Sequence, residues 1–148
     1  MKSETSKAIE EFVRKYGESK LVDVLSPNRQ EDILTIIANA DVHPYHALHK
    51  RGEIFVASEG SLDFSTEESA VSEIESVLLR VAKKLKEKRW SCVYLVPFGP
   101  APLALQIKSL VHKILDVETI DVLHIGNGAH IDIHINPRSI AARIKSEL

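Results

Sequence analysis

The chain has 148 residues, 44% of them apolar and 27% charged, a composition typical of one soluble globular domain with a sizeable core. Its 19 basic and 21 acidic residues give a net charge of −2, which disfavours a protein that binds polymeric nucleic acid. The single cysteine, Cys92, excludes an internal disulfide. No window approaches the roughly 18 apolar residues of a membrane span, and no apolar signal region opens the chain, so we expect a cytoplasmic protein without a membrane partner.

The amino-terminal third predicts helices. Apolar residues recur at helical spacing over 4–16 and are followed by Gly17, a natural helix end. Ser26-Pro27 has the form of a helix start, and the apolar residues of 33–37 extend a second predicted helix to about Ala40. We therefore predict a single domain over 1–148, with a helical element in 1–50 and a Rossmann-like core in 51–148.

Three histidines, His43, His46 and His49, lie three residues apart in the segment 41–52. A zinc site would need a further ligand or an open water position, and the chain has neither a cysteine pair nor a His-Glu-x-x-His motif. A polar loop with exposed imidazoles is the favoured interpretation, and a loop that contacts a ligand stays open. We predict no metal and no cofactor.

A strand over 53–58 and a long helix follow. Ser65 with Glu68 three residues later has the form of a capping box, and an apolar stripe continues to Leu85. The basic residues at the end of this helix favour a solvated helix terminus, with a polyanion-binding patch as the alternative.

The most distinctive stretch is 91–115. An apolar, β-branched strand over Cys92–Val96 enters a turn with three prolines and Gly99, and helical spacing begins at Leu103. In open α/β sheets ligands bind beside such strand ends, where the free amides of a helix's first turn favour an anion. One glycine is too few for a dinucleotide fingerprint, and no Gly-Lys-Ser/Thr or Gly-x-Ser-x-Gly motif is present. The turn either preorganises amides for a ligand or is a packed crossover without one. Lys108 and Arg138 are weak candidates for charge partners.

The carboxyl-terminal part predicts a hairpin and a helix. A strand over 119–125, the Asn127-Gly128 turn and an alternating strand over 129–136 precede a helix that Ser139 can cap. His130, Asp132 and His134 share one face of the last strand. Alternate residues lie about 7 Å apart along a strand, which is too wide for one metal ion, so solvated edge residues are favoured and a ligand- or partner-facing surface stays open.

The element order predicts the fold class. Strands separated by helices require right-handed crossovers and a parallel sheet, while the last strand returns antiparallel at an edge. The expected fold is an α/β, Rossmann-like three-layer unit, with a mostly parallel sheet and an antiparallel edge hairpin, preceded by N-terminal helices.

The segment Val93–Leu105, VYLVPFGPAPLAL, resembles the second half of SAVED domains, the SMODS-associated sensor domains of bacterial anti-phage signalling, which are related to the CARF (CRISPR-associated Rossmann) sensors. The amphipathic helix over 67–88 and the strand over 120–125 also fit, so the resemblance covers roughly residues 53–137. It implies binding of a cyclic oligonucleotide second messenger, with the phosphates met by the strand-to-helix turns.

On this chain those turns give the following candidate ligand-binding residues: Ser58, Glu59, Phe98, Gly99, Pro100, Ala101, Gly126 and Asn127. Members of this family usually have two Rossmann-like halves and a fused effector, whereas this chain has room for one half. Ligand binding on it therefore requires a homo-oligomer or a partner subunit, or has been lost.

Two alternatives stay open. The chain is a small interaction protein, such as a toxin-immunity protein or an accessory subunit, that uses the strand 129–136 or the loop 41–52 as its interface. Less favoured is a metal-independent phosphodiesterase that degrades such messengers, with His124, His130 and His134 as its candidate residues. No set of nucleophile, base and orienting residue can be named from the sequence.

Overall fold

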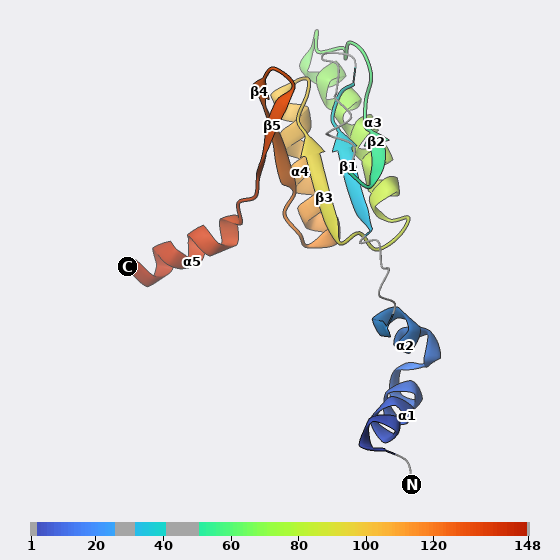
Figure 1. The fold of residues 1–148 in the computed structure, drawn as a ribbon. Helices are drawn as coiled ribbons and strands as arrows, with labels where there is room; N and C mark the ends of the chain where they lie inside the picture. Colours follow the sequence, from blue (N-terminus) through green and yellow to red (C-terminus); the bar gives the residue numbers. More distant parts are fainter. Residues whose placement is uncertain (1–2, 26–31, 41–50, 148) are drawn as a thin grey trace. The chain divides into compact units, whose positions relative to one another are not determined.

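The computed structural model describes residues 3–25, 32–40 and 51–147 (Figure 1), and the chain divides into two compact units, residues 1–30 and 31–148. The predicted helix start at Ser26-Pro27 and the histidines His43, His46 and His49 lie outside the described residues. No helix in the described ranges is long and apolar enough to cross a membrane.

The first unit is a pair of helices, α1 over Glu4–Tyr16 and α2 over Glu18–Leu25. The prediction for α1 is confirmed. Ser3 caps the helix by accepting the Ser6 N–H at 3.2 Å, and Gly17 ends it with a φ of 88°. None of the α1 residues is buried, so this helix is not part of a core.

The second unit contains a five-stranded sheet in the order β2-β1-β3-β4-β5. The first four strands in this order run parallel, and β5 pairs antiparallel with β4, which confirms the expected α/β sheet with an antiparallel edge hairpin. The strands are β1 Ile33–Ile37, β2 Glu53–Val56, β3 Cys92–Val96, β4 Ile120–Gly126 and β5 Ala129–Ile133.

The helix predicted to run to about Ala40 is wrong, because residues 33–37 form β1, the strand between β2 and β3. Both faces of β1 are covered, and Leu34, Ile36 and Ile37 are fully buried. A strand buried on both faces is apolar at successive positions, so its pattern also fits helical spacing. The sheet therefore begins before residue 51, where the core was expected to start.

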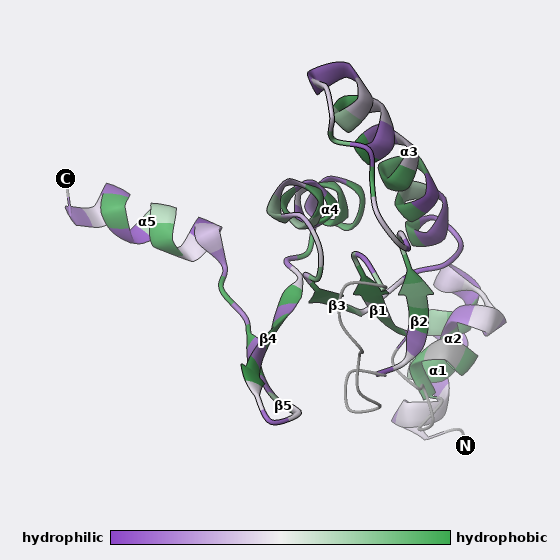
Figure 2. Ribbon diagram, turned by 90° about the horizontal axis from the view of Figure 1, so that it is seen from above, coloured by the Kyte–Doolittle hydropathy of each residue, from purple (hydrophilic) through white to green (hydrophobic). Residues whose placement is uncertain are grey.

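Both crossover helices, α3 over Glu67–Leu85 and α4 over Ala101–Leu115, lie on one face of the sheet (Figure 2). Their buried residues form one core with alternate residues of β1 and β3, which include Leu34, Ile36, Val77, Val81, Val93, Leu95, Ile107 and Val111. A smaller cluster on the other face joins Ile37, Val96 and Val122.

The cap predicted for α3 is wrong by one residue. Thr66 is the N-cap, and its hydroxyl accepts the Ser69 N–H at 3.1 Å, while the Ser69 side chain accepts the Thr66 N–H. The Ser65 hydroxyl instead donates to Asp63 at 2.6 Å, before the helix begins.

The carboxyl-terminal helix α5 covers Pro137–Glu147 and has no buried residue. It begins earlier than predicted, since Asn136, not Ser139, supplies the side-chain acceptor, for the Arg138 N–H at 3.0 Å. Pro137 takes the first helical position, where its missing N–H costs no hydrogen bond. The strand β5 correspondingly ends at Ile133, three residues before the predicted end.

Candidate functional site

The carboxyl ends of β1 and β2 are locked together by side-chain hydrogen bonds. The Ser58 hydroxyl donates to the Ala38 carbonyl at 2.6 Å, and the Asn39 side-chain amide donates to the Gly60 carbonyl at 2.8 Å. Ser58 and Asn39 are both buried, so neither hydroxyl nor amide faces solvent. The two side chains therefore build the scaffold of this edge and do not project from it.

The turn after β3 presses against the same scaffold. Gly99 has a φ of 89°, and a Cβ at this position would lie 2.8 Å from the Asn39 Cβ, closer than side chains pack. A larger residue at position 99 would push the turn away from β1. The candidate residues Ser58, Glu59 and Phe98–Ala101 are thus brought to one edge of the sheet, around Asn39.

Sequence reasoning missed Asn39, although a polar residue directly after an apolar strand is a usable signal. The signal was lost because the segment before Asn39 was interpreted as a helix. Once β1 is recognised as a strand, Asn39 stands at its carboxyl end, the position at which α/β sheets bind ligands.

Few hydrogen-bond donors remain at the start of α4. Pro100 is the N-cap and makes no side-chain cap, Pro102 has no N–H, and the Leu103 N–H donates to the Pro100 carbonyl at 3.1 Å. Within the part of the chain that the structure describes, no hydrogen bond uses the N–H of Gly99 or Ala101. These two amides, at the positive end of the helix dipole, are the groups that can meet an anion.

The other two candidates, Gly126 and Asn127, lie in the hairpin turn. Strand β4 pairs with β3 only at Ile120 and Asp121 and then continues into the hairpin. Figure 2 shows this hairpin running away from the layer of β1, β2 and β3. The structure therefore places the hairpin turn apart from the edge that holds the other six candidates.

The two cations named as charge partners bind the chain's own acidic groups. Lys108 Nζ lies 2.9 Å from Asp121 Oδ2 and 2.8 Å from the Thr119 hydroxyl. The guanidinium of Arg138 lies 2.5 Å from Asp116. At the carboxyl edge itself, Arg80 of α3 donates to the Ala57 carbonyl at 2.7 Å, so its charge lies beside the end of β2.

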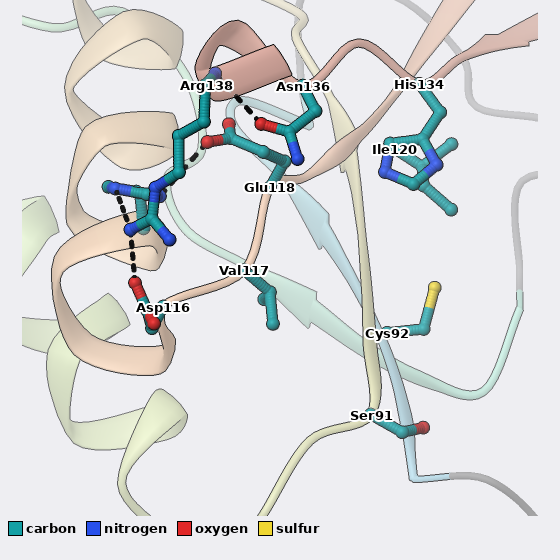
Figure 3. Close-up of a pocket in the computed structure, with 10 residues that line it drawn as sticks. Ser91, Cys92, Asp116, Val117, Glu118, Ile120, His134, Asn136 and Arg138 are labelled. Carbon is teal, nitrogen blue, oxygen red and sulfur yellow. Dashed lines mark hydrogen bonds and ion pairs between the residues drawn. The ribbon is translucent and has the colours of Figure 1, made fainter. Parts of the chain in front are cut away.

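A cavity of about 300 Å³ lies where β3 begins and α4 ends (Figure 3). In it, Arg138 contacts His112 Nε2 at 3.2 Å, and His112 Nδ1 lies 3.1 Å from Glu118 Oε1. Arg138 also forms a hydrogen bond with Asp116 that holds the pKa of this carboxyl below its ordinary value. The cavity holds the carboxylates of Asp116 and Glu118 and the single guanidinium of Arg138, so its charge does not favour binding of a polyanion. The contacts of Arg138 with Asp116 and His112 instead anchor the first turn of α5 to the end of α4.

The histidines of the hairpin are divided between two places. His124 and His130 are cross-strand neighbours, whereas His134 lines the cavity beside α5. Asp132 forms a bidentate pair with Arg51, one arm of which measures 2.7 Å. No group of three or more histidine, cysteine, aspartate or glutamate side chains among the described residues is placed to hold a metal ion.

The pair of Arg51 and Asp132 was not foreseen from the sequence. Arg51 precedes β2 at one side of the sheet, and Asp132 lies in β5 at the other, while the guanidinium stacks 3.7 Å from the centre of the Tyr94 ring. The hydrogen bond with Asp132 raises the pKa of Arg51, and burial raises the pKa of Tyr94. The arginine therefore stays charged and ties the hairpin to the face opposite α3 and α4.

Comparison of the chain with protein-family models, with curated protein sequences and with solved structures found no match.

Proposed function

We propose that this chain is a non-catalytic sensor module, and that its ligand is a cyclic oligonucleotide second messenger bound at the carboxyl edge of β1, β2 and β3. One observation carries the proposal: the turn 97–101 presents the Gly99 and Ala101 amides at the uncapped start of α4, on a rigid scaffold. The resemblance of Val93–Leu105 to SAVED domains supplies the class of ligand. In this proposal the module acts in the cytoplasm, in bacterial anti-phage signalling.

The rigidity of the edge supports binding. Asn39 and Ser58 hold the ends of β1 and β2 together before any ligand arrives, and Gly99 packs directly on Asn39. Donors that are already positioned lose little conformational entropy when they bind, so more of the interaction energy appears as affinity. A hydrogen bond to a charged phosphate is worth roughly 1.5–3 kcal/mol.

Two amides do not cover all the phosphates of a cyclic oligonucleotide. The remaining contacts must come from elsewhere, and one cation at this edge is Arg80, whose guanidinium donates to the Ala57 carbonyl. A second copy of the chain or a partner subunit would supply the missing half of the site, as the single Rossmann-like unit requires.

The test is calorimetric titration with cyclic di-, tri- and tetranucleotides, using the unmodified chain, Ala101→Glu and Ala101→Gln. Ala101 is exposed at the first position of α4, where an acidic residue suits the helix dipole, so neither variant disturbs the fold. We expect at least one nucleotide to bind, about tenfold weaker binding to the Glu variant through repulsion of the phosphate, and a change within about twofold for the Gln variant.

Two results would contradict the proposal. One is the absence of heat for every nucleotide with the unmodified chain. The other is equal affinity for the Ala101→Glu and Ala101→Gln variants, because a phosphate at this turn must respond to a carboxylate placed beside it.

A further inference from the structure

The hairpin β4–β5 has an apolar face that the described chain does not cover. Leu123 and Ile131 are directly opposite each other and are 45% and 46% exposed. They lie on the side of the sheet that carries α4, because the same side of β4 holds Asp121, the partner of Lys108. Ile125, at the irregularity of β4 between His124 and Gly126, and Ile135, which follows β5, are also more than half exposed.

The outer edge of β5 has no neighbour among the described strands. Natural proteins protect such edges with lysine, proline or an inward-pointing charge. The strand is Ala-His-Ile-Asp-Ile, which contains no lysine or proline, and its one acidic residue, Asp132, is paired with Arg51. The edge therefore keeps its capacity to pair with another strand.

The helix α5 is the second uncovered apolar element. Ile140 and Ile144 are one turn apart and are 51% and 54% exposed. A helix of 11 residues is too short to be stable by itself in water, so its apolar stripe needs a surface to pack on. Arg138 anchors the start of α5 beside Asp116 and His112, at the end of β5 that is farther from the hairpin turn.

We propose that a second copy of this chain covers both elements, through antiparallel pairing of β5 with the β5 of the other copy. A strand satisfies the free backbone groups of an edge, which a helix cannot do, and an antiparallel strand pair can be its own two-fold partner. The reversed direction brings the start of the other copy's α5 beside the hairpin turn. The stripe of Ile140 and Ile144 from one copy then meets the face of Leu123 and Ile131 on the other.

The available area agrees with a dimer. Six branched side chains, each about half exposed, present on the order of 500 Å² of apolar surface, which is at the upper end of what a monomer leaves uncovered. The paired strand edges and the body of α5 add to this, so each copy approaches the roughly 800 Å² that a standard interface buries per partner.

Sedimentation equilibrium of the whole chain, without ligand, tests the inference over about 1–100 µM, the range of a moderately stable dimer. We expect a dimer for the unmodified chain and at least tenfold weaker association for Ile131→Glu and for Ile144→Glu. The matched control is Leu79→Glu on α3, a position that is 65% exposed and outside the proposed interface, and it should leave association unchanged. Circular dichroism confirms that each variant is folded.

Hydrogen exchange supplies a second measurement. We expect the outer amides of β5 to exchange more slowly as the concentration rises, and Ile144→Glu to remove this effect although it lies outside the strand. A chain that is still monomeric at about 100 µM would overturn the inference. The apolar faces of the hairpin and α5 would then be covered by a different protein or by the chain's own helices. A dimer that both hairpin and helix variants leave intact would overturn it as well. Because no ligand is used, the result is independent of the proposed nucleotide sensing.

Discussion

Isoleucine is buried in the parallel part of the sheet and exposed in the β4–β5 hairpin. Ile36 of β1 is fully buried between its neighbouring strands and the helices α3 and α4, whereas Ile131 of β5 is 46% exposed. Both are isoleucines in one continuous sheet. The parallel part has a core built from its own strands and helices, while the hairpin and α5 have apolar surfaces that none of the residues described for this unit covers. This difference is the basis of the proposal that the first region provides stability and the second provides association.

Truncating one isoleucine in each region should give the largest contrast. Ile36→Ala leaves a cavity in the core and should lower the free energy of unfolding by roughly 2–5 kcal/mol, while Ile131→Ala should lower it by less than about 1 kcal/mol. Urea denaturation followed by the fluorescence of Trp90, which is buried in the core, measures both.

These measurements are made at low protein concentration in an Ile144→Glu background, in which association of the proposed dimer is at least tenfold weaker. Equal losses for Ile36→Ala and Ile131→Ala would show that the hairpin face is covered within the single chain.

Glycine substitutions should give an intermediate contrast. Gly99 and Gly126 have nearly the same φ, 89° and 93°, so alanine is strained by about 1 kcal/mol at either position. A Cβ at Gly99 also lies 2.8 Å from Asn39, whereas at Gly126 nothing lies within 4 Å. Gly99→Ala should therefore cost about 1–2 kcal/mol more than Gly126→Ala.

Thermal unfolding of the two variants gives this difference, and the strain common to both positions cancels. Identical unfolding temperatures would show that the turn 97–101 does not rest on β1, which would also remove the rigidity on which the proposed ligand site depends.

The smallest contrast is expected in the pH dependence of stability that the exposed carboxylates of Glu53 and Asp116 contribute. The hydrogen bond from Lys84 holds the pKa of Glu53 below its ordinary value of 4.5, and Arg138 lowers that of Asp116 below 3.8. A lowered pKa means that the unfolded chain binds more protons near this pH. The stabilisation is therefore present above about pH 4.5 and is lost as the pH falls through the folded-state pKa.

The two carboxylates need different measurements because they stabilise different parts of the chain. Glu53 joins β2 to α3 through Lys84, and Asp116 holds the start of α5 through Arg138. Glu53→Gln should flatten the dependence of the urea midpoint on pH between about 5 and 3, and Asp116→Asn should change only the helical signal. Both effects are small because solvent screens exposed pairs. An unchanged pH slope in Glu53→Gln would mean that its contact with Lys84 adds no stability.

The strand, turn and helix over 92–115 could be predicted because three local signals agree there. A β-branched apolar run, a turn rich in proline and helical spacing each select one structure. In β1 the local signal fits two structures, and the choice is made by its neighbours β2 and β3, which come much later in the chain. Single-sequence periodicity does not contain that information.

The residues of the candidate site also fall into two groups, those predicted from local sequence and those that depend on distant contacts. The turn 97–101 was found because its residues are adjacent in the sequence. Asn39, and the pairs of Arg51 with Asp132 and Arg138 with Asp116, depend on contacts between distant segments, which neither composition nor spacing indicates. Gly126 and Asn127 lie apart from the other six candidates because β4 continues past the end of its pairing with β3.

The central position of β1 also has a consequence for the order in which the chain folds. The hairpin β4–β5 closes a turn of a few residues and can form early, whereas β1 must wait for both of its partners, which are synthesised after it. Until β3 arrives, the apolar residues of β1 have only β2 to pair with and are open to wrong contacts. Slow insertion of this one strand should set the folding rate, and a fragment that starts after it would lack the strand that joins the two halves of the sheet.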